Sequence, residues 1–257
     1  MRHFNFSVWN FQKKVKGGGC TMILVILSLL AAAQTAQRDS VMQKLKDMAV
    51  AYRNANHLSF DATYLYANED KPAVYLDSLK GSFKVHGNRY AYILDNTEFL
   101  GNDSLNLVVF NEDKIIYVNG PSIAQSANPL AMIDSVMMIN QYSNVTLTSS
   151  GNIQKITIDF SPGFMFKKAE YIIDPVSGLI TRMKAIIHSV EMYDPAVKPM
   201  FNKTAEYGIL EVRFSNYKTN AFTDAAFSET RYILKSGHQY KGAAAYSNYQ
   251  ILNGSIR

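Results

Sequence analysis

The sequence predicts a mainly β (α+β) protein in which one large, curved antiparallel sheet, or incomplete β-barrel, is covered by helices. Apolar and polar residues alternate with a period of two in many short segments. Turn dipeptides such as Gly87-Asn88 and Gly101-Asn102 separate these segments, and only two stretches have a helical period. With 47% hydrophobic and 18% charged residues, the chain has enough apolar side chains for a core, which excludes the disordered classes.

Residues 1–33 form a predicted signal peptide. A cationic stretch with three lysines precedes an apolar run over 22–30, and three alanines follow the run. The run is too short to cross a hydrocarbon layer of about 30 Å as a helix, and the three parts together are typical of a secretory signal. A short N-terminal anchor helix is the alternative interpretation. Cleavage after Ala33, or else after Ala36, would leave 34–257 as one exported, periplasmic domain.

Cysteine and charge limit what this domain could bind. The single Cys20 precedes the apolar run, whereas a lipid-anchoring cysteine would follow it, so we expect a mature protein without cysteine, as suits an oxidising compartment. The leader holds four basic and no acidic residues, which leaves 22 Lys and Arg against 21 Asp and Glu. The sequence pI of 9.1 therefore belongs largely to the leader, and we expect no nucleic-acid partner.

The pattern along the chain predicts two helices. In 39–56, Val41, Leu45, Met48 and Tyr52 recur at spacings of four, three and four, so one amphipathic helix is expected. The second helix, 129–142, is rich in methionine and so apolar that it must be partly buried. Strands are expected at 58–66, 74–85, 88–94, 105–110, 114–118, 144–149, 153–160, 168–173, 179–189, 207–217, 227–234 and 244–252.

The residues that could carry chemistry are scattered. Four histidines of the mature chain lie in different predicted elements without metal-ligand spacing: His57, His86, His188 and His238. The pair His188 and Glu191 is a weak match to a metal motif, because it lies at a strand end rather than on a helix. Three carboxylates occupy polar positions where a solvated face is expected: Asp159, Asp174 and Glu211. We therefore expect no enzyme, no metal site and no cofactor.

The aromatic content admits two interpretations. The chain has 16 Tyr and 14 Phe, many at period-two positions that would share one face of the sheet. Their side chains either fill the core, as in small barrels, or line a cavity for an apolar ligand that the methionine-rich helix covers.

Several segments resemble the bacterial LolA/LolB-like lipoprotein-carrier superfamily. These are A-E-Y-I-I-D-P-V-S-G-L-I-T-R-M-K at 169–184, L-E-V-R-F-S-N-Y-K-T-N at 210–220, D-A-A-F at 224–227, G-S-F-K-V-H-G-N-R-Y-A-Y at 81–92 and N-L-V-V-F-N-E-D-K-I-I-Y-V at 106–118. The resemblance covers most of residues 39–235. It implies an incomplete barrel whose helices cover an apolar cavity, in which the family's carriers shelter lipoprotein acyl chains.

The chain departs from the family at one motif. Where the carriers have an Arg-Pro pair, this sequence has His86 and Gly87, so the arginine implicated in their gating is missing. The tail at 236–257 lies outside the resemblance. Alternation and resemblance together select the candidate ligand-binding residues, which are Phe60, Tyr64, Tyr66, Phe83, Tyr90, Tyr92, Met132, Ile133, Met137 and Ile158.

Two functions remain open on the sequence. The first is a periplasmic carrier or chaperone for lipoprotein acyl chains or another lipid-like ligand, acting as a monomer with inner- and outer-membrane partner proteins. The second is a non-catalytic binding or sensor module with a filled barrel that engages a protein partner.

Overall fold

A computed structural model describes residues 19–121, 142–189, 205–237 and 239–254, with the side chains of the first helix described from Gln37 onward. The predicted methionine-rich helix, with Met132, Ile133 and Met137, lies outside the described residues except for its last position. That position, Tyr142, begins a strand. Glu191 and His238 also lie outside.

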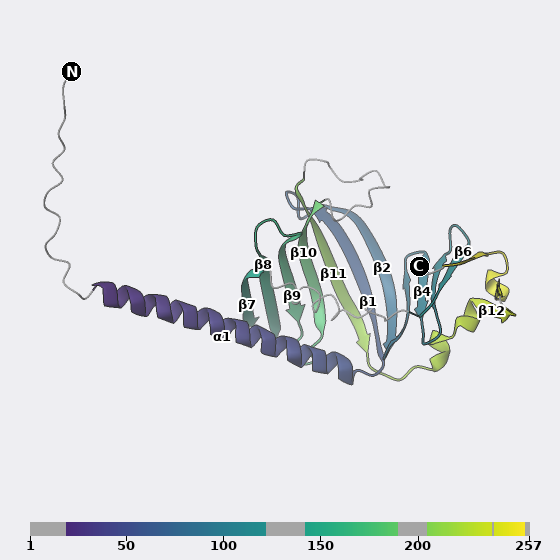
Figure 1. The fold of residues 1–257 in the computed structure, drawn as a ribbon, viewed down its shortest axis with the longest axis horizontal. Coiled ribbons are helices and arrows are strands. Elements are labelled where there is room, and N and C mark those ends of the chain that lie inside the picture. Colours follow the sequence, from purple (N-terminus) through teal and green to yellow (C-terminus); the bar gives the residue numbers. More distant parts are fainter. Residues whose placement is uncertain (1–18, 122–141, 190–204, 238, 255–257) are drawn as a thin grey trace, which may run out of the picture.

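Most of the described chain belongs to one curved sheet of twelve strands, which Figure 1 shows from its side. Its strands are β1 (Leu58–Asn68), β2 (Tyr75–His86), β3 (Arg89–Leu94), β4 (Thr97–Gly101), β5 (Asn106–Phe110), β6 (Ile115–Asn119), β7 (Tyr142–Ser150), β8 (Ile153–Phe160), β9 (Phe166–Ile173), β10 (Ile180–His188), β11 (Tyr207–Lys218) and β14 (Gln250–Asn253).

The strand order is β14-β6-β5-β4-β3-β2-β1-β11-β10-β9-β8-β7. Every neighbouring pair is antiparallel except β14 and β6, which run parallel. Because β7 and β14 lie at opposite ends of this order, the described sheet does not close on itself. The predicted fold class, a mainly β chain with an incomplete antiparallel barrel, is confirmed.

Tight turns set the register of the consecutive hairpins. Gly87 and Gly151 have φ values of +59° and +54°, a left-handed conformation that glycine adopts without strain. The sequence analysis missed the short strand β4. Glu98 and Leu100 are buried on one face of β4 and Phe99 on the other face is half-buried, but the charged residue at a buried position hides this alternation in the sequence.

Helix α1 spans Gly19–Asn54 and so begins well before the predicted start at Asp39. Its predicted apolar stripe is confirmed, because Val41, Met48 and Tyr52 are buried and Leu45 packs beside them. The Tyr52 hydroxyl accepts a hydrogen bond from the Ile180 N–H at 3.1 Å, which fixes the helix end to β10. In the described part of the chain, no helix has the length and apolar character to cross a membrane.

The chain after β11 differs from the prediction. In place of strands at 227–234 and 244–252, it forms three 3-10 turns and three short strands. The turns are η2 (Asp224–Phe227), η3 (Glu229–Arg231) and η4 (Ala244–Tyr246), and the strands are β12 (Ile233–Ser236), β13 (Gln239–Gly242) and β14. Side chains compete with the extended backbone here, since the Ser228 hydroxyl caps η3 through the Thr230 N–H. We call residues 224–254 the C-terminal segment.

The sheet carries two hydrophobic cores on opposite faces. The helix-side core packs α1 against residues such as Ile156, Tyr171 and Val212, and we call this face the helix face. The tail-side core packs β4–β6 against the C-terminal segment, and we call that face the tail face. Its buried members are Leu100, Leu105, Leu107, Val109, Ile116, Val118, Tyr232 and Ile233. Figure 1 shows α1 crossing one end of the sheet and the C-terminal segment, in yellow, at the other end.

A buried carboxylate holds the C-terminal segment to β4. Glu98 is 9% exposed and accepts hydrogen bonds from the hydroxyls of Tyr232 at 2.9 Å and Tyr246 at 3.0 Å. The Asn111 amide donates a third, at 3.2 Å, and the Tyr249 hydroxyl in turn donates to Asn111 at 2.9 Å. The phenols of the segment thereby satisfy an acid that would otherwise be costly to bury.

Candidate functional site

An aromatic row crosses four adjacent strands on the helix face. Phe60, Phe83, Tyr92 and Phe99 are direct cross-strand partners from β1 to β4. Successive ring centroids lie 4.9, 4.9 and 4.4 Å apart, and the rings are stacked. The row exists because period-two alternation and antiparallel register bring every second residue to the same face, where aromatic pairs stabilise the sheet.

The aromatic row passes from the protein interior onto an open surface. Phe60 and Phe83 are only 4% and 5% exposed, since they belong to the helix-side core. Tyr92 and Phe99 are half-buried. In the same register the row continues through Val108 to Tyr117, which is 38% exposed.

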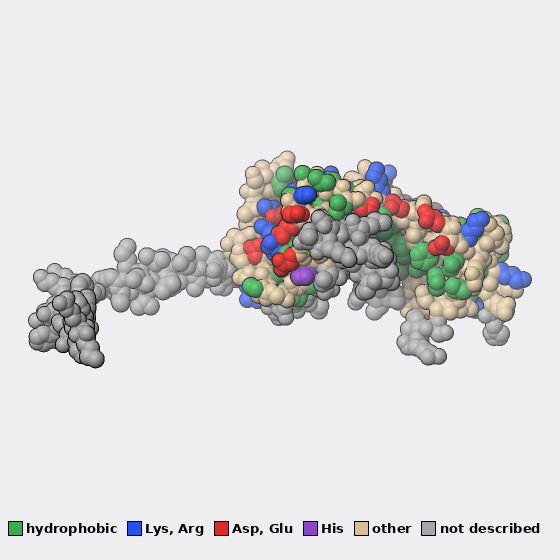
Figure 2. Space-filling model, turned by 90° about the horizontal axis from the view of Figure 1, so that it is seen from above, with side chains coloured by type: hydrophobic (Ala, Val, Ile, Leu, Met, Phe, Trp, Pro, Cys, Tyr) green, Lys and Arg blue, Asp and Glu red, His purple; other side chains and the backbone are tan. Residues whose placement is uncertain are grey.

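Two hollows lie on the helix face of this open end. One, of about 420 Å³, is lined by β5 and β6, and the other, of about 360 Å³, by β2 to β5. They share Phe110 and Asp113, so we treat them as one feature, the helix-face trough. Its apolar lining consists of Leu79, Leu94, Phe99, Val108, Phe110, Ile115 and Tyr117. Figure 2 shows hydrophobic side chains beside acidic ones at the end of the molecule where β4–β6 lie.

The rim of the helix-face trough is acidic. Asp95, Glu112 and Asp113 come from the turns after β3 and β5. Asp95 is held in place by the Lys80 N–H, which donates to its carboxylate at 3.0 Å, and Glu112 by the Asn96 amide at 2.6 Å.

Tyrosines near the aromatic row keep their protons. Burial raises the pKa of Tyr64 and of Tyr92 to about 12, and neighbouring phenols add to the effect. Burial likewise raises the pKa of Tyr66. All three therefore present neutral hydroxyl groups at physiological pH, in keeping with an apolar surface.

The structure brings together six of the predicted binding residues. Phe60, Tyr64, Tyr66, Phe83, Tyr90 and Tyr92 all lie on the helix face of β1–β3, because their register positions alternate in step. The Tyr90 ring packs directly against Gly101 of β4, where a side chain larger than hydrogen would collide with it. Its hydroxyl donates to the Asn106 side chain at 2.8 Å.

Ile158 does not reach the helix-face trough, because it is fully buried in the helix-side core. The trough residues of β4–β6 were missed by the sequence analysis. Alternation in 106–110 and 115–119 carried the signal for Val108, Phe110 and Tyr117, but only the register shows that their face is the open one.

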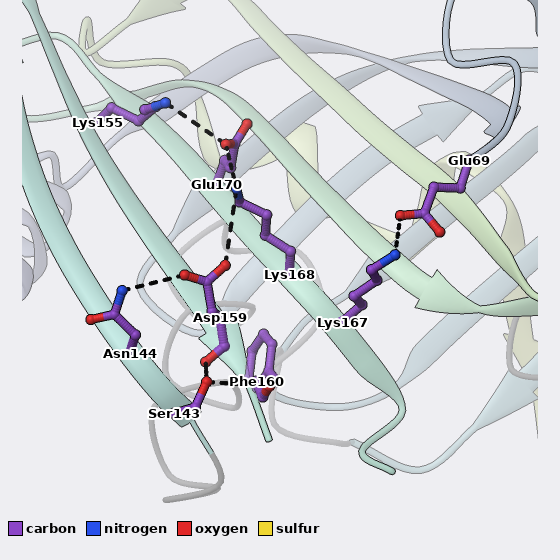
Figure 3. Close-up of polar contacts among 9 residues, drawn as sticks. All are labelled: Glu69, Ser143, Asn144, Lys155, Asp159, Phe160, Lys167, Lys168 and Glu170. Carbon is purple, nitrogen blue, oxygen red and sulfur yellow. Dashed lines mark hydrogen bonds and ion pairs between the residues drawn. The ribbon is translucent and has the colours of Figure 1, made fainter. Parts of the chain in front are cut away.

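The tail face of β7–β10 is a solvated ionic surface. Figure 3 shows Glu170 between Lys155, at 3.7 Å, and Lys168, at 3.6 Å, while Lys168 also approaches Asp159 at 4.0 Å. Asp159 is exposed, as predicted. The pair formed by Lys167 and Glu69, at 2.6 Å, ties β9 to the turn after β1.

The two other carboxylates differ in environment. Asp174 is a turn residue whose carboxylate accepts the Val176 N–H at 2.9 Å, and this hydrogen bond is the largest cause of its lowered pKa. The prediction for Glu211 is wrong, because this side chain is buried and pairs with Arg213 at 2.7 Å.

Two of the histidines predicted to be separate come together. His57 and His86 stack with centroids 4.0 Å apart, and Arg89 lies 2.6 Å from the His86 Nδ1. Asp224 pairs with Arg89 at 2.9 Å. Among the described residues, no three His, Cys, Asp or Glu side chains form a group that could hold a metal ion.

No protein-family model matches the sequence, and a search of curated proteins finds no match. Solved structures do resemble the fold. A conserved protein from Thermus thermophilus is 7% identical, with a TM-score of 0.44 over 83% of this chain and 99% of that one. Mycobacterium tuberculosis lipoprotein LppX is 10% identical, with a TM-score of 0.39 over 72% and 99%.

A LolA superfamily protein from Nitrosomonas europaea is 12% identical, with a TM-score of 0.27 over 68% of this chain and 90% of that one. The Nitrosomonas protein belongs to the superfamily that segments 81–92 and 169–184 of the chain resemble, and the likeness between the two structures is one of fold alone.

Proposed function

We propose that this protein is a periplasmic carrier or chaperone that binds lipoprotein acyl chains or a similar apolar ligand in the helix-face trough. The observation that carries the proposal is the aromatic row, which leaves the core at Phe83 and continues to Tyr117 on an open, hollowed surface. Each hollow falls within the volume range of ligand pockets.

The dimensions of the trough suit a chain-like ligand. From β2 to β6 the helix face extends over about 19 Å, at roughly 4.8 Å per strand. Each methylene that leaves water there contributes about 0.8 kcal/mol. The half-buried state of Tyr92 and Phe99 leaves apolar surface for such contacts without unfolding any element.

The acidic rim favours one class of apolar ligand. Asp95, Glu112 and Asp113 would repel the carboxylate of a free fatty acid. Acyl chains joined to a polypeptide through neutral bonds meet no such repulsion. The rim therefore supports acylated proteins over free fatty acids as the cargo.

The proposal includes export through the predicted leader 1–33, a monomeric and non-catalytic domain, and inner- and outer-membrane partner proteins that deliver and accept the cargo.

The second candidate function is a module with a filled barrel that engages a protein partner, and one observation favours it. Phe60, Phe83 and Ile158 are packed in a closed core, so this part of the predicted cavity is filled.

Titration with the neutral dye N-phenyl-1-naphthylamine tests the carrier proposal. We expect a dissociation constant in the micromolar range or below. Tyr117→Asp should weaken binding by about tenfold or more, because the ligand would bury an unpaired charge. Val176→Asp is the matched control, since Val176 is 92% exposed in a turn away from the trough.

Equal affinities of the two variants would contradict the carrier proposal. Native mass spectrometry of protein purified from its own host adds a direct readout. A co-purified lipid or lipopeptide is expected, and it should be depleted in Tyr117→Asp. Circular dichroism of each variant confirms that the fold is retained.

A further inference from the structure

A further cavity lies on the tail face, across the sheet from the helix-face trough. It has a volume of about 560 Å³ and lies between β1–β3 and the part of the C-terminal segment that contains η2 and η3. Alternation places Ser59, Asp61, Ser82 and Lys84 on this face, opposite to the aromatic row. We call it the tail-face pocket. Phe60, Phe83 and Tyr92 of the aromatic row are also among its lining residues, but it shares none with the helix-face trough.

Three basic side chains line the tail-face pocket from three different elements: Lys84 of β2, Lys218 of β11 and Arg231 of η3. Lys218 and Lys84 flank the same residue of β1, because Ser59 pairs with both. In the described part of the chain, none of the three belongs to an ion pair. Lys218 does lie near enough to Asp61 for its charge to contribute to the lowered pKa of that carboxyl.

The one carboxylate in the pocket is already engaged. Asp61 accepts hydrogen bonds from the Ser82 hydroxyl at 2.6 Å and from the Asn216 amide at 2.7 Å. These bonds, that of Asn216 first, lower its pKa, so it stays ionised. Three cations against one carboxylate leave the lining with a net positive charge.

Part of the lining is apolar. Ala91 and Ile93 of β3 contribute their side chains to the tail face, and Ile93 is 46% exposed. Tyr232 closes one side, with the Arg231 guanidinium 5.1 Å from its ring centroid. A ligand would therefore meet cationic heads beside an apolar patch.

We propose that the tail-face pocket is a second binding site, specific for a small amphiphilic anion whose phosphate, sulfate or carboxylate head pairs with Lys84, Lys218 and Arg231 and whose apolar body packs on Ala91 and Ile93. Lysine and arginine bind such heads through charge-assisted hydrogen bonds. A volume of about 560 Å³ suits a small molecule rather than a polymer segment.

The experiment uses the anionic dye 8-anilinonaphthalene-1-sulfonate with full-length protein in which Tyr117→Asp has weakened the helix-face trough. The dye should still bind, and more weakly as salt is added. Adding Lys84→Gln and Lys218→Gln should weaken binding by about tenfold or more through lost charge-assisted contacts. The control is Lys80→Gln, which removes one positive charge from the same face of β2 beyond the pocket.

Competition separates the sources of the anion. We expect octyl phosphate to displace the dye at a lower concentration than inorganic phosphate does, because the apolar patch adds to affinity. Equal competition would overturn the amphiphilic part of the proposal. Equal dye affinity in the lysine double variant and in Lys80→Gln, or affinity that does not depend on salt, would overturn the site itself. Neither result depends on whether the neutral dye binds the trough.

Discussion

The two cores of this protein are closed in different ways. The helix-side core is covered by α1, whose buried stripe contributes Val41 and Met48 through apolar contacts. The tail-side core is covered by irregular backbone, and the hydroxyls of Tyr232 and Tyr246 hold that cover to buried Glu98. One cover thus depends on hydrophobic periodicity, and the other on a polar cluster that must be fully satisfied.

The different positions of these two covers explain why the helix-face trough exists. The C-terminal segment covers the tail face of strands β4–β6. Helix α1 lies next to β7 and belongs to the same core cluster as buried residues of β8 to β11 on the helix face. The helix face of β4–β6 therefore keeps exposed apolar residues such as Phe110 and Tyr117. The open trough is a consequence of covering the two ends of one sheet on opposite faces.

The largest expected effect comes from opening the helix-side core. Ile156 is fully buried, so Ile156→Ala should lower the free energy of unfolding by about 2–5 kcal/mol through lost burial and the cavity left behind. Chemical denaturation followed by circular dichroism measures this. The control is Ile153→Ala on the same strand, where a side chain 50% exposed should change stability by about 0.5 kcal/mol or less.

Removing the polar cluster should have a smaller and more local effect. Glu98→Ala leaves the buried Tyr232 hydroxyl without its acceptor, which costs about 1–3 kcal/mol, whereas the bonds from the Tyr246 hydroxyl and the Asn111 amide are only part-buried and add less. Limited proteolysis should then cut within the C-terminal segment while α1 stays protected. Glu98→Gln keeps an acceptor and should be milder. Simultaneous cleavage at both ends would show that the cores are not independent.

Alkaline pH should weaken both ends in parallel. Burial raises the pKa of Tyr92 to about 12 on the helix face, and burial together with Glu98 raises the pKa of Tyr246 to about 12 in the C-terminal segment. Since the folded pKa values exceed the unfolded value of about 10, this stability is fully present below pH 10 and is lost as pH rises toward 12.

Absorbance at 295 nm reports the titration of the phenols. Tyr246→Phe should remove one late-titrating group and leave the one at Tyr92. If all tyrosines of the folded protein titrated near pH 10, the assignment of these raised pKa values would be wrong.

The smallest effect is expected at the ionic surface of β8 and β9. Lys168 bridges Asp159 and Glu170 at 4.0 and 3.6 Å, but all three groups are partly exposed. Lys168→Gln should therefore change the free energy of unfolding by at most about 1 kcal/mol, and less in high salt. A larger loss in thermal unfolding would mean that this face contributes to holding the sheet.

The success of the sequence analysis followed the strength of the local pattern. In 153–160 and 207–217, alternation over many residues specified strands with the correct buried face, because one face is apolar and the other polar. Around 97–101 the pattern was absent, because Glu98 is buried by partners more than a hundred residues away. Most candidate aromatic residues lie on the helix face, as the period-two alternation predicted. Their exposure, however, depends on whether another element of the chain packs over them.

Local residue patterns were enough to predict the mainly β class, the apolar stripe of α1 and most strand boundaries, since each of these depends on residues close together in the chain. Contacts between distant segments place the C-terminal segment on the tail face, and among the described residues they leave Tyr117 on the helix face 38% exposed. The tertiary structure also brings Lys84, Lys218 and Arg231 together around one cavity. These features arise from contacts between distant segments, which local periodicity does not encode.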